Sequence, residues 1–202
     1  MADGEEAKLV ERLKRQDEAA FNELVRLYQG RIFRLVFRML GDRAEAEDLA
    51  QEVFVTVFKS IGGFRGDSKL STWMYRVATN HCKNRIKYLG RRARGQKQEF
   101  DEVTDAHSLE SATMSTSVRL PRPDEMVTGR ETEHFIRVAL HELPEDQRQL
   151  VVLRDIENLT YEEIQKLTGL ASGTVKSRLH RARLALAKRV RELQRAPKEG
   201  ET

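Results

Sequence analysis

The sequence predicts an all-α protein in which two small helical domains are joined by a flexible polar linker. Apolar residues recur at helical spacing near both ends of the 202-residue chain, as amphipathic helices require. No convincing stretch alternates apolar and polar residues as a half-buried strand would. A polar segment separates the two helical blocks, so we expect domains at 1–94 and 129–202, with the linker at 95–128.

The first domain is expected to begin with two helices whose ends are marked by capping residues. Asp17 should cap a helix whose apolar residues continue to Gly41, where a glycine can end it. Asp42 should cap the next helix, which carries an almost unbroken apolar stripe from Ala46 to Ile61. The two glycines that follow this stripe should terminate the helix.

The segment 64–70, FRGDSKL, reads as a loop that leads into a third helix. That helix is expected to start at Ser71 or Thr72 and to stop at Gly90. Its second half overlaps KNRIKYLGRRARGQK, residues 83–97, which contains seven basic residues and no acidic one. This basic cluster is a candidate for contact with a phosphate backbone.

Aromatic residues lie just before this basic cluster: Phe64, Trp73 and Tyr75, with Asn80 following them. Rings that stack on bases, beside basic side chains that follow the backbone, are typical of proteins that bind single-stranded nucleic acid. A tryptophan at helical spacing is more often part of a core, so this cluster alone leaves both interpretations open.

Residues 95–128 are polar, acidic and rich in serine and threonine, and they include Pro121 and Pro123. A segment with so few large apolar residues cannot offset its conformational entropy by burial. We therefore expect a linker, and its length predicts two domains that sit apart.

The second domain is predicted to contain a helix-turn-helix. Thr160 and Glu163 have the spacing of a capping box, Gly169 suits the turn, and Ser172 is expected to cap the next helix. An earlier short helix should begin after Pro144, which fits the first turn. The last helix then carries apolar residues on one face: Val175, Leu179, Ala182, Leu186, Val190 and Leu193.

The opposite face of the last helix suits DNA. Residues 170–193 hold seven Lys or Arg and no acid before Glu192, whereas solvated helix faces usually mix both signs. In helix-turn-helix proteins the start of the second helix enters the major groove, where basic and hydroxyl side chains contact bases and phosphates. The candidates are Ser172, Thr174, Lys176, Ser177, Arg178, His180, Arg181 and Arg183.

The helix predicted after Asp42 carries an acidic outer face that includes Asp48, Gln51 and Glu52. Such a face is commonly solvated surface. In a protein that binds DNA it should point away from the DNA, and it could dock on a basic partner protein.

Other function classes find little support. No nucleotide-binding glycine motif, HExxH or recognisable catalytic triad occurs, so we expect no enzyme, cofactor or metal site. Cys82 is the single cysteine and excludes an intramolecular disulfide; its neighbour His81 would point about 100° away on a helix, against a metal pair. Without a signal peptide or membrane span, a cytoplasmic location is expected.

These segments together resemble the extracytoplasmic-function (ECF, group IV) sigma factors of bacterial RNA polymerase. The stretch from AFNELVRLYQGRIFRLVFRMLGD to the end of AEDLAQEVFVTVFKSIGGFRGDSKLSTWMYRVATNHCKNRIKYLGRR is similar to sigma region 2. The stretch ALHELPEDQRQLVVLRDIENLTYEEIQKLTGLASGTVKSRLHRARLAL is similar to sigma region 4. Both occur in the family's order, with a polar linker between them.

The resemblance implies a mechanism. Core RNA polymerase would be the partner, through its β′ clamp and β flap, and Asp48, Gln51 and Glu52 would contact the clamp. Region 4 would read the −35 element as duplex, with Arg178 and Arg183 expected on phosphates or in intramolecular pairs. An anti-sigma factor would be a further partner. Region 2 would capture the melted −10 strand with Phe64, Arg65, Gly66, Asp67, Ser68, Lys69, Trp73, Tyr75, Asn80 and Lys83.

Two other classes remain as alternatives. An ordinary helix-turn-helix regulator would bind duplex DNA without polymerase, but it would need a sensor or dimerisation domain where the basic and acidic faces of the first block lie. A pure protein-interaction module would not explain the acid-free recognition helix.

Overall fold

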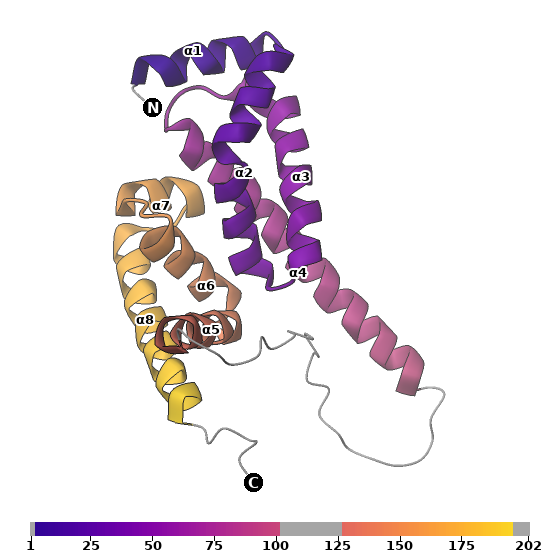
Figure 1. The fold of residues 1–202 in the computed structure, drawn as a ribbon, viewed down its shortest axis with the longest axis vertical. Coiled ribbons are helices and arrows are strands. Elements are labelled where there is room, and N and C mark those ends of the chain that lie inside the picture. Colours follow the sequence, from indigo (N-terminus) through magenta and orange to yellow (C-terminus); the bar gives the residue numbers. More distant parts are fainter. Residues whose placement is uncertain (1–2, 102–126, 196–202) are drawn as a thin grey trace.

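The computed structural model describes the backbone of residues 3–101 and 127–195, and side chains within 4–92 and 132–195 (Figure 1). These residues form helices and no strand, which confirms the all-α class. In chain order the elements are α1 (Asp3–Lys14), α2 (Glu18–Leu40), α3 (Arg43–Ser60), the 3₁₀ turn η1 (Ile61–Gly63), α4 (Leu70–Asp101), α5 (Val127–Glu142), α6 (Glu145–Val151), the π-helical turn η2 (Val152–Ile156), α7 (Tyr161–Thr168) and α8 (Ser172–Arg195).

The helices α2, α3 and α4 pack into one bundle around the predicted apolar stripes. Between α2 and α3 the chain reverses within two residues. Gly41 adopts φ 84°, a left-handed conformation that costs other residues energy. The side chain of Asp42 then accepts a hydrogen bond from the backbone N–H of Glu45, so both predicted caps are confirmed.

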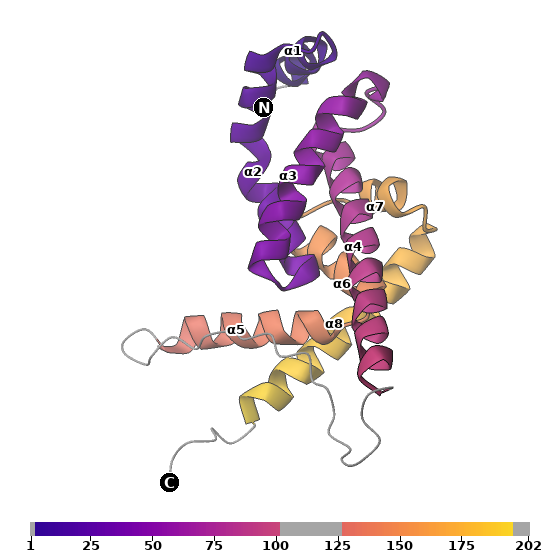
Figure 2. The ribbon, with the colours of Figure 1, turned by 90° about the vertical axis from the view of Figure 1, so that its right-hand side faces the viewer.

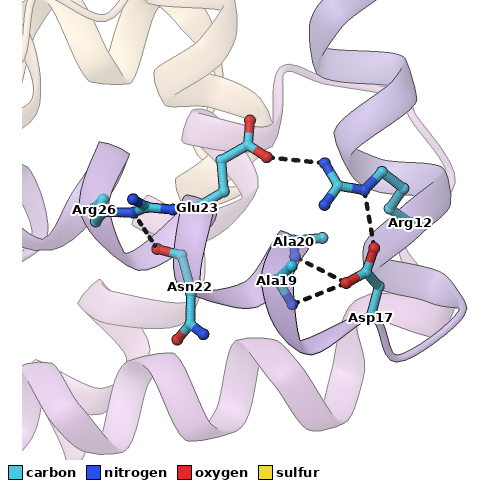
Figure 3. A network of polar contacts seen from close by, with 7 residues as sticks. All are labelled: Arg12, Asp17, Ala19, Ala20, Asn22, Glu23 and Arg26. Atoms are coloured by element: carbon cyan, nitrogen blue, oxygen red, sulfur yellow. Dashed lines mark hydrogen bonds and ion pairs between the residues drawn. The ribbon is translucent and has the colours of Figure 1, made fainter.

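The helix α1, which was not predicted, crosses one end of this bundle and is tied to α2 by a polar network (Figure 3). Asp17 accepts from the N–H groups of Ala19 and Ala20, which confirms it as the α2 cap. Arg12 of α1 donates to Asp17 at 2.9 Å and to Glu23 of α2 at 2.9 Å. The hydrogen bond from Arg12, supported by the cap, lowers the pKa of Asp17 below its ordinary value.

The helix α4 is longer than predicted. It begins at Leu70, ahead of Ser71, and continues through Gly90 to Asp101. The predicted stop at Gly90 is therefore wrong, and the first residues of the predicted linker are helical. The rest of the linker, residues 102–126, lies outside the described residues, and α5 already begins at Val127.

The second block folds as α5 to α8 and contains the predicted helix-turn-helix. Thr160 and Glu163 make both hydrogen bonds of a capping box. Gly169 ends α7 in the left-handed conformation, with φ 72°. Ser172 is itself the first residue of α8, because the carbonyl of Ala171 accepts the helix's first hydrogen bond, from Val175. The prediction that Ser172 caps this helix was one residue too late.

The two blocks pack against each other, so the prediction that they sit apart is wrong for this structure. Figures 1 and 2 show α6 and α7 beside α2 and the first half of α4. Tyr75 of α4 donates to Glu157 at 2.7 Å, and Arg148 of α6 donates to the Met39 carbonyl at 2.5 Å. The composition of a linker limits how far two domains can separate, but it does not say which of their faces attract.

Candidate nucleic-acid interface

The recognition helix α8 is oriented by its apolar face. Val175, Leu179 and Ala182 are buried against the rest of the second block. This burial turns the other side of the helix outward, where Lys176, Ser177, His180 and Arg181 are exposed. Ser172 and Thr174 are half-exposed at the start of the helix, and Ser177 donates its hydroxyl hydrogen to the Thr174 carbonyl at 3.1 Å.

Two of the predicted arginines hold α8 in place. Arg178 pairs with Asp146 of α6 at 3.4 Å. Arg183 donates from Nε to Asp155 of η2 at 3.0 Å, and this hydrogen bond raises the pKa of its guanidinium. These two cations are partly neutralised by carboxylates, so they fix the angle at which α8 is presented.

The other basic side chains on this face of α8 are exposed to solvent. Lys176 and Arg181 form no ion pair with any residue that the structure describes, and the Lys176 ammonium lies 5.7 Å from the centre of the Tyr161 ring. Together with His180 they form an exposed basic strip along the first half of α8, which we call the α8 strip. A positively charged strip on a helix anchored from behind has the geometry of a major-groove reader.

The loop 64–69 projects between α1 and α4. Gly66 adopts φ 81°, which allows the chain to turn sharply. Arg65, Asp67 and Lys69 are exposed and Ser68 is half-exposed. A cleft of about 400 Å³ opens between this loop and α1, and its lining includes Glu6, Val10, Lys14, Phe64, Arg65 and Lys69.

The aromatic residues of this region are less exposed than a stacking platform would be. Phe64 is buried and packs on Trp73, with ring centroids 5.4 Å apart, while Trp73 itself is half-buried. Tyr75 is buried, and burial together with its hydrogen bond to Glu157 raises the pKa of its hydroxyl. Asn80 is exposed and Lys83 half-exposed further along α4.

Residues of the second block cover part of this region, and sequence reasoning did not identify them. Thr72 donates to Glu163 of α7 at 3.2 Å, and Lys69 lies 3.9 Å from the same carboxylate. Lys166 of α7 donates to the Asp67 carbonyl at 3.1 Å. No sequence pattern signals these contacts, because they join residues about ninety positions apart and depend on how the blocks pack.

The acidic face of α3 is exposed as predicted from its spacing. Asp48, Gln51 and Glu52 are all exposed, and Val55, one turn further on, is 50% exposed. Glu52 accepts from Arg85 of α4 at 2.7 Å, so part of its charge is already paired. No sequence pattern singled out Val55, which adds an exposed apolar side chain to the same face.

The His81–Cys82 pair forms no common site. His81 lies 3.0 Å from the Thr56 hydroxyl on the outside of the bundle. Cys82 is buried, and burial raises the pKa of its thiol to about 12. Within the described ranges, no group of three His, Cys, Asp or Glu side chains is arranged to hold a metal ion, and no helix combines the length and apolar character of a membrane span.

Comparison with known proteins identifies both blocks. Residues 24–92 match the family model for sigma-70 region 2, and residues 136–186 match that for sigma-70 region 4. The RNA polymerase sigma-H factor of Pseudomonas aeruginosa is 37% identical, covering 95% of this chain and 96% of that protein. The ECF RNA polymerase sigma factor SigW of Bacillus subtilis is 35% identical, covering 92% and 97%.

Solved structures agree on the fold. The sigma factor RpoE of Bartonella quintana, in complex with the anti-sigma factor NepR, superposes with a TM-score of 0.61 at 23% identity, covering 85% of this chain and 96% of that one. CnrH, in complex with the cytosolic domain of CnrY, gives 0.60 at 20% identity, covering 91% and 95%. With two region models in order and relatives similar over nearly their whole length, the chain belongs to the ECF RNA polymerase sigma factors, which direct RNA polymerase to promoters.

Proposed function

We propose that α8 reads the −35 element as duplex DNA and that the segment 64–83 captures the melted −10 strand, so that each block supplies one half of promoter recognition. The observation that carries this proposal is the α8 strip: an exposed, acid-free basic face at the start of a helix whose opposite side is anchored. This division assigns residues 1–94 to region 2 and 129–202 to region 4, although α4 itself continues to Asp101 and α5 begins at Val127.

In the −35 complex, the first half of α8 would enter the major groove. Arg181 and Lys176 have donors suited to guanine edges or phosphates, and Ser172, Thr174 and Ser177 can contact backbone or bases from the helix start. His180 lies between the two cations and would tune base preference. Arg178 and Arg183 would act chiefly by orienting α8 through their carboxylate partners.

In the −10 complex, the loop 64–69 would hold a flipped base, with Asn80 and Lys83 following the strand along α4. Unstacking a base costs a few kcal/mol, which the protein must offset by new contacts. The cleft beside Arg65 and Lys69 offers space, and its three cations outnumber its two carboxylates, Glu6 and Glu11. Phe64 and Trp73 support the wall of the loop, so their contribution would be to shape the pocket more than to provide an open ring.

Core polymerase would bind the exposed row of α3. Asp48, Gln51 and Val55 lie on its outer face and are not engaged in a named contact elsewhere in the described structure. An acidic and apolar row of this kind suits a basic helical surface such as the β′ clamp. Glu52 would contribute less, because Arg85 already holds its carboxylate. The β flap would contact the second block.

Promoter binding would require the two blocks to separate. Elements centred near −35 and −10 are about 25 base pairs apart, or about 85 Å of B-form DNA at 3.4 Å per base pair. In the described arrangement Thr72 touches α7, and the adjoining α8 strip lies within roughly two helix diameters of it, about 20–25 Å. The arrangement in which the two blocks pack together, which we call the closed arrangement, therefore cannot read both elements at once.

The proposed function also implies where the protein acts and how it is regulated. A polymerase subunit without chemistry of its own needs no cofactor and would act in the bacterial cytoplasm. RpoE and CnrH were solved with anti-sigma proteins bound, and we propose a comparable protein antagonist for this chain, one that covers the polymerase-binding faces.

The test is run-off transcription with purified core RNA polymerase and promoter fragments from the source genome. Defined start sites that require this protein would support the proposal, and their alignment would reveal both elements. A protein that binds duplex DNA without core enzyme and yields no transcript would instead be a helix-turn-helix regulator.

A further inference from the structure

Three arginines form a row on α2 at the boundary between the two blocks. Arg31, Arg34 and Arg38 are three and four residues apart, which places them on one side of the helix. Arg31 and Arg34 are exposed. With residues of both blocks they border a cleft of about 300 Å³, whose other lining residues are Tyr75, Ile156, Glu157 and Asn158.

Arg38 has unused donor capacity at the inner end of this row. Its Nη1 atom is buried and has no hydrogen-bond partner among the residues that the structure describes. Glu157 Oε1 is 3.8 Å from it, close enough for attraction but too far for a hydrogen bond. A buried N–H without an acceptor is costly, so the cleft favours an additional oxygen acceptor.

Glu157 places a carboxylate in this cleft. Its side chain is only 9% exposed, and Oε2 accepts the hydrogen bond from the Tyr75 hydroxyl at 2.7 Å. Glu157 follows η2 and therefore belongs to the second block. A carboxylate held between a phenol and a guanidinium occupies the kind of site that a phosphate oxygen would take, because both anions use the same donors.

We propose that Arg31, Arg34 and Arg38 form a binding row for the phosphates of the single-stranded promoter DNA, and that Glu157 occupies the Arg38 end of this row while the two blocks are packed together. This inference rests on the proposed function. Tyr75 connects the row to the −10 segment of α4, so a strand leaving that segment has a continuous basic surface before it. The row is about 10 Å long at 1.5 Å per residue, a length over which a strand that keeps its duplex spacing carries about three phosphates.

Glu157 and the strand would then compete for the same cations. When the blocks separate, Glu157 leaves with the second block, and the arginine row and the Tyr75 hydroxyl become available together. The closed chain should consequently bind single strands more weakly than an open one, without any covering protein.

The experiment measures binding of the full-length chain to a fluorescently labelled 20-nucleotide single strand by anisotropy, at several salt concentrations. The double variant Arg31→Ala/Arg34→Ala removes two phosphate contacts and leaves the half-buried Arg38 in place. Arg26→Ala is the matched control, because Arg26 is an exposed arginine of α2 that does not line the cleft. Circular dichroism verifies that each variant is folded.

We expect the double variant to bind several-fold more weakly at low salt, with a salt slope about 1.4 smaller, since each phosphate contact to a single strand contributes about 0.7. Arg26→Ala should match the wild type. Glu157→Gln keeps the shape and the Tyr75 contact but removes the competing charge, so it should bind several-fold more tightly. An unchanged slope in the double variant, or no tighter binding by Glu157→Gln, overturns the inference.

Two further probes identify the source of the phosphate. The same sequence as duplex should lose much less affinity in the double variant than the single strand does; an equal loss overturns the assignment to the single strand. Sodium pyrophosphate at matched ionic strength should compete only weakly with the single strand. Stoichiometric binding of pyrophosphate would overturn the assignment to DNA and would indicate a site for a small anion. Run-off transcription by the wild-type chain tests the proposed function separately. A failure of the proposed function can therefore be distinguished from a failure of the arginine row to bind single-stranded DNA.

Discussion

Acidification should destabilise this protein through His141, a half-buried residue where the second block meets the turn between α2 and α3. Arg148 donates from Nη1 toward His141 Nδ1, at 3.3 Å. Because a guanidinium can only donate, Nδ1 must accept, and the neutral ring carries its proton on Nε2. A second proton would have to lie on Nδ1, facing a cation. Burial first, and then the charge of Arg148, lowers the pKa of His141 to about 4.

The sign and size of this pH effect on stability follow from the difference in proton binding between the folded and unfolded chain. Between pH 6.5, the ordinary histidine value, and pH 4, the unfolded chain binds a proton that the folded chain does not. The stabilising contribution of neutral His141 is therefore complete above pH 6.5 and is lost as the pH falls toward 4. With these two values the loss between pH 7.5 and pH 5 is about 2 kcal/mol. Because the ring is only partly buried, solvent screening reduces this to about 1–2 kcal/mol.

Urea unfolding at pH 7.5 and pH 5.0 measures the effect, with the wild type and His141→Gln compared at both. The variant lacks the titrating ring, so its free energy of unfolding should fall by about 1–2 kcal/mol less than that of the wild type. His180→Gln serves as the control, because His180 is exposed on α8. If the wild type and His141→Gln lose equal stability on acidification, the account of His141 as a half-buried neutral group is refuted.

Three further outcomes are expected. Arg181→Ala should weaken binding to a −35 duplex by about 1–3 kcal/mol and relax base preference, measured by anisotropy with holoenzyme; unchanged affinity and preference would refute the groove assignment. Gly41→Ala should lower the free energy of unfolding by at least about 1–2 kcal/mol, because Gly41 has φ 84° and a Cβ there would lie 2.9 Å from His141; urea unfolding decides it. Asp48→Lys should reduce capture of core polymerase in pull-down while leaving thermal stability unaltered, and equal capture would exclude this row from the polymerase interface.

The helix boundaries that depend on local chemistry were predictable from the sequence. Asp17, Asp42 and the Thr160–Glu163 pair each satisfy backbone N–H groups within their own turn, so three or four residues contain the whole cause. The predicted helix stop at Gly90 was wrong because a glycine in a helix costs only about 1 kcal/mol relative to alanine. The helical residues on both sides of it outweigh that cost, and α4 continues.

Features that depend on distant residues were not predictable in the same way. The α1 helix is held by Leu9, Val10 and Leu13, which are buried against the bundle, although their short stretch shows no strong pattern of its own. The spacing on α8 identified the outward face of the helix, but it could not show which arginines are engaged by carboxylates of other helices. The family resemblance set Arg178 and Arg183 apart from Arg181 as candidates for phosphate contacts or intramolecular pairs, and only the packing shows which carboxylates hold them.

Hydrogen bonds cross the boundary between the blocks at several points, and buried apolar residues of both blocks also form one continuous cluster there. The Tyr75–Glu157 and Thr72–Glu163 hydrogen bonds have carboxylate acceptors, so each is worth about 1.5–3 kcal/mol net, and water or another ligand can take the place of either partner. DNA phosphates and polymerase can supply such replacements at the moment of separation. The apolar residues of the shared cluster would also be exposed on opening, at about 25 cal/mol per Å², so promoter and polymerase must offset that cost as well. The blocks can therefore pack against each other in the free chain and still separate when contacts with promoter and polymerase replace the contacts between them.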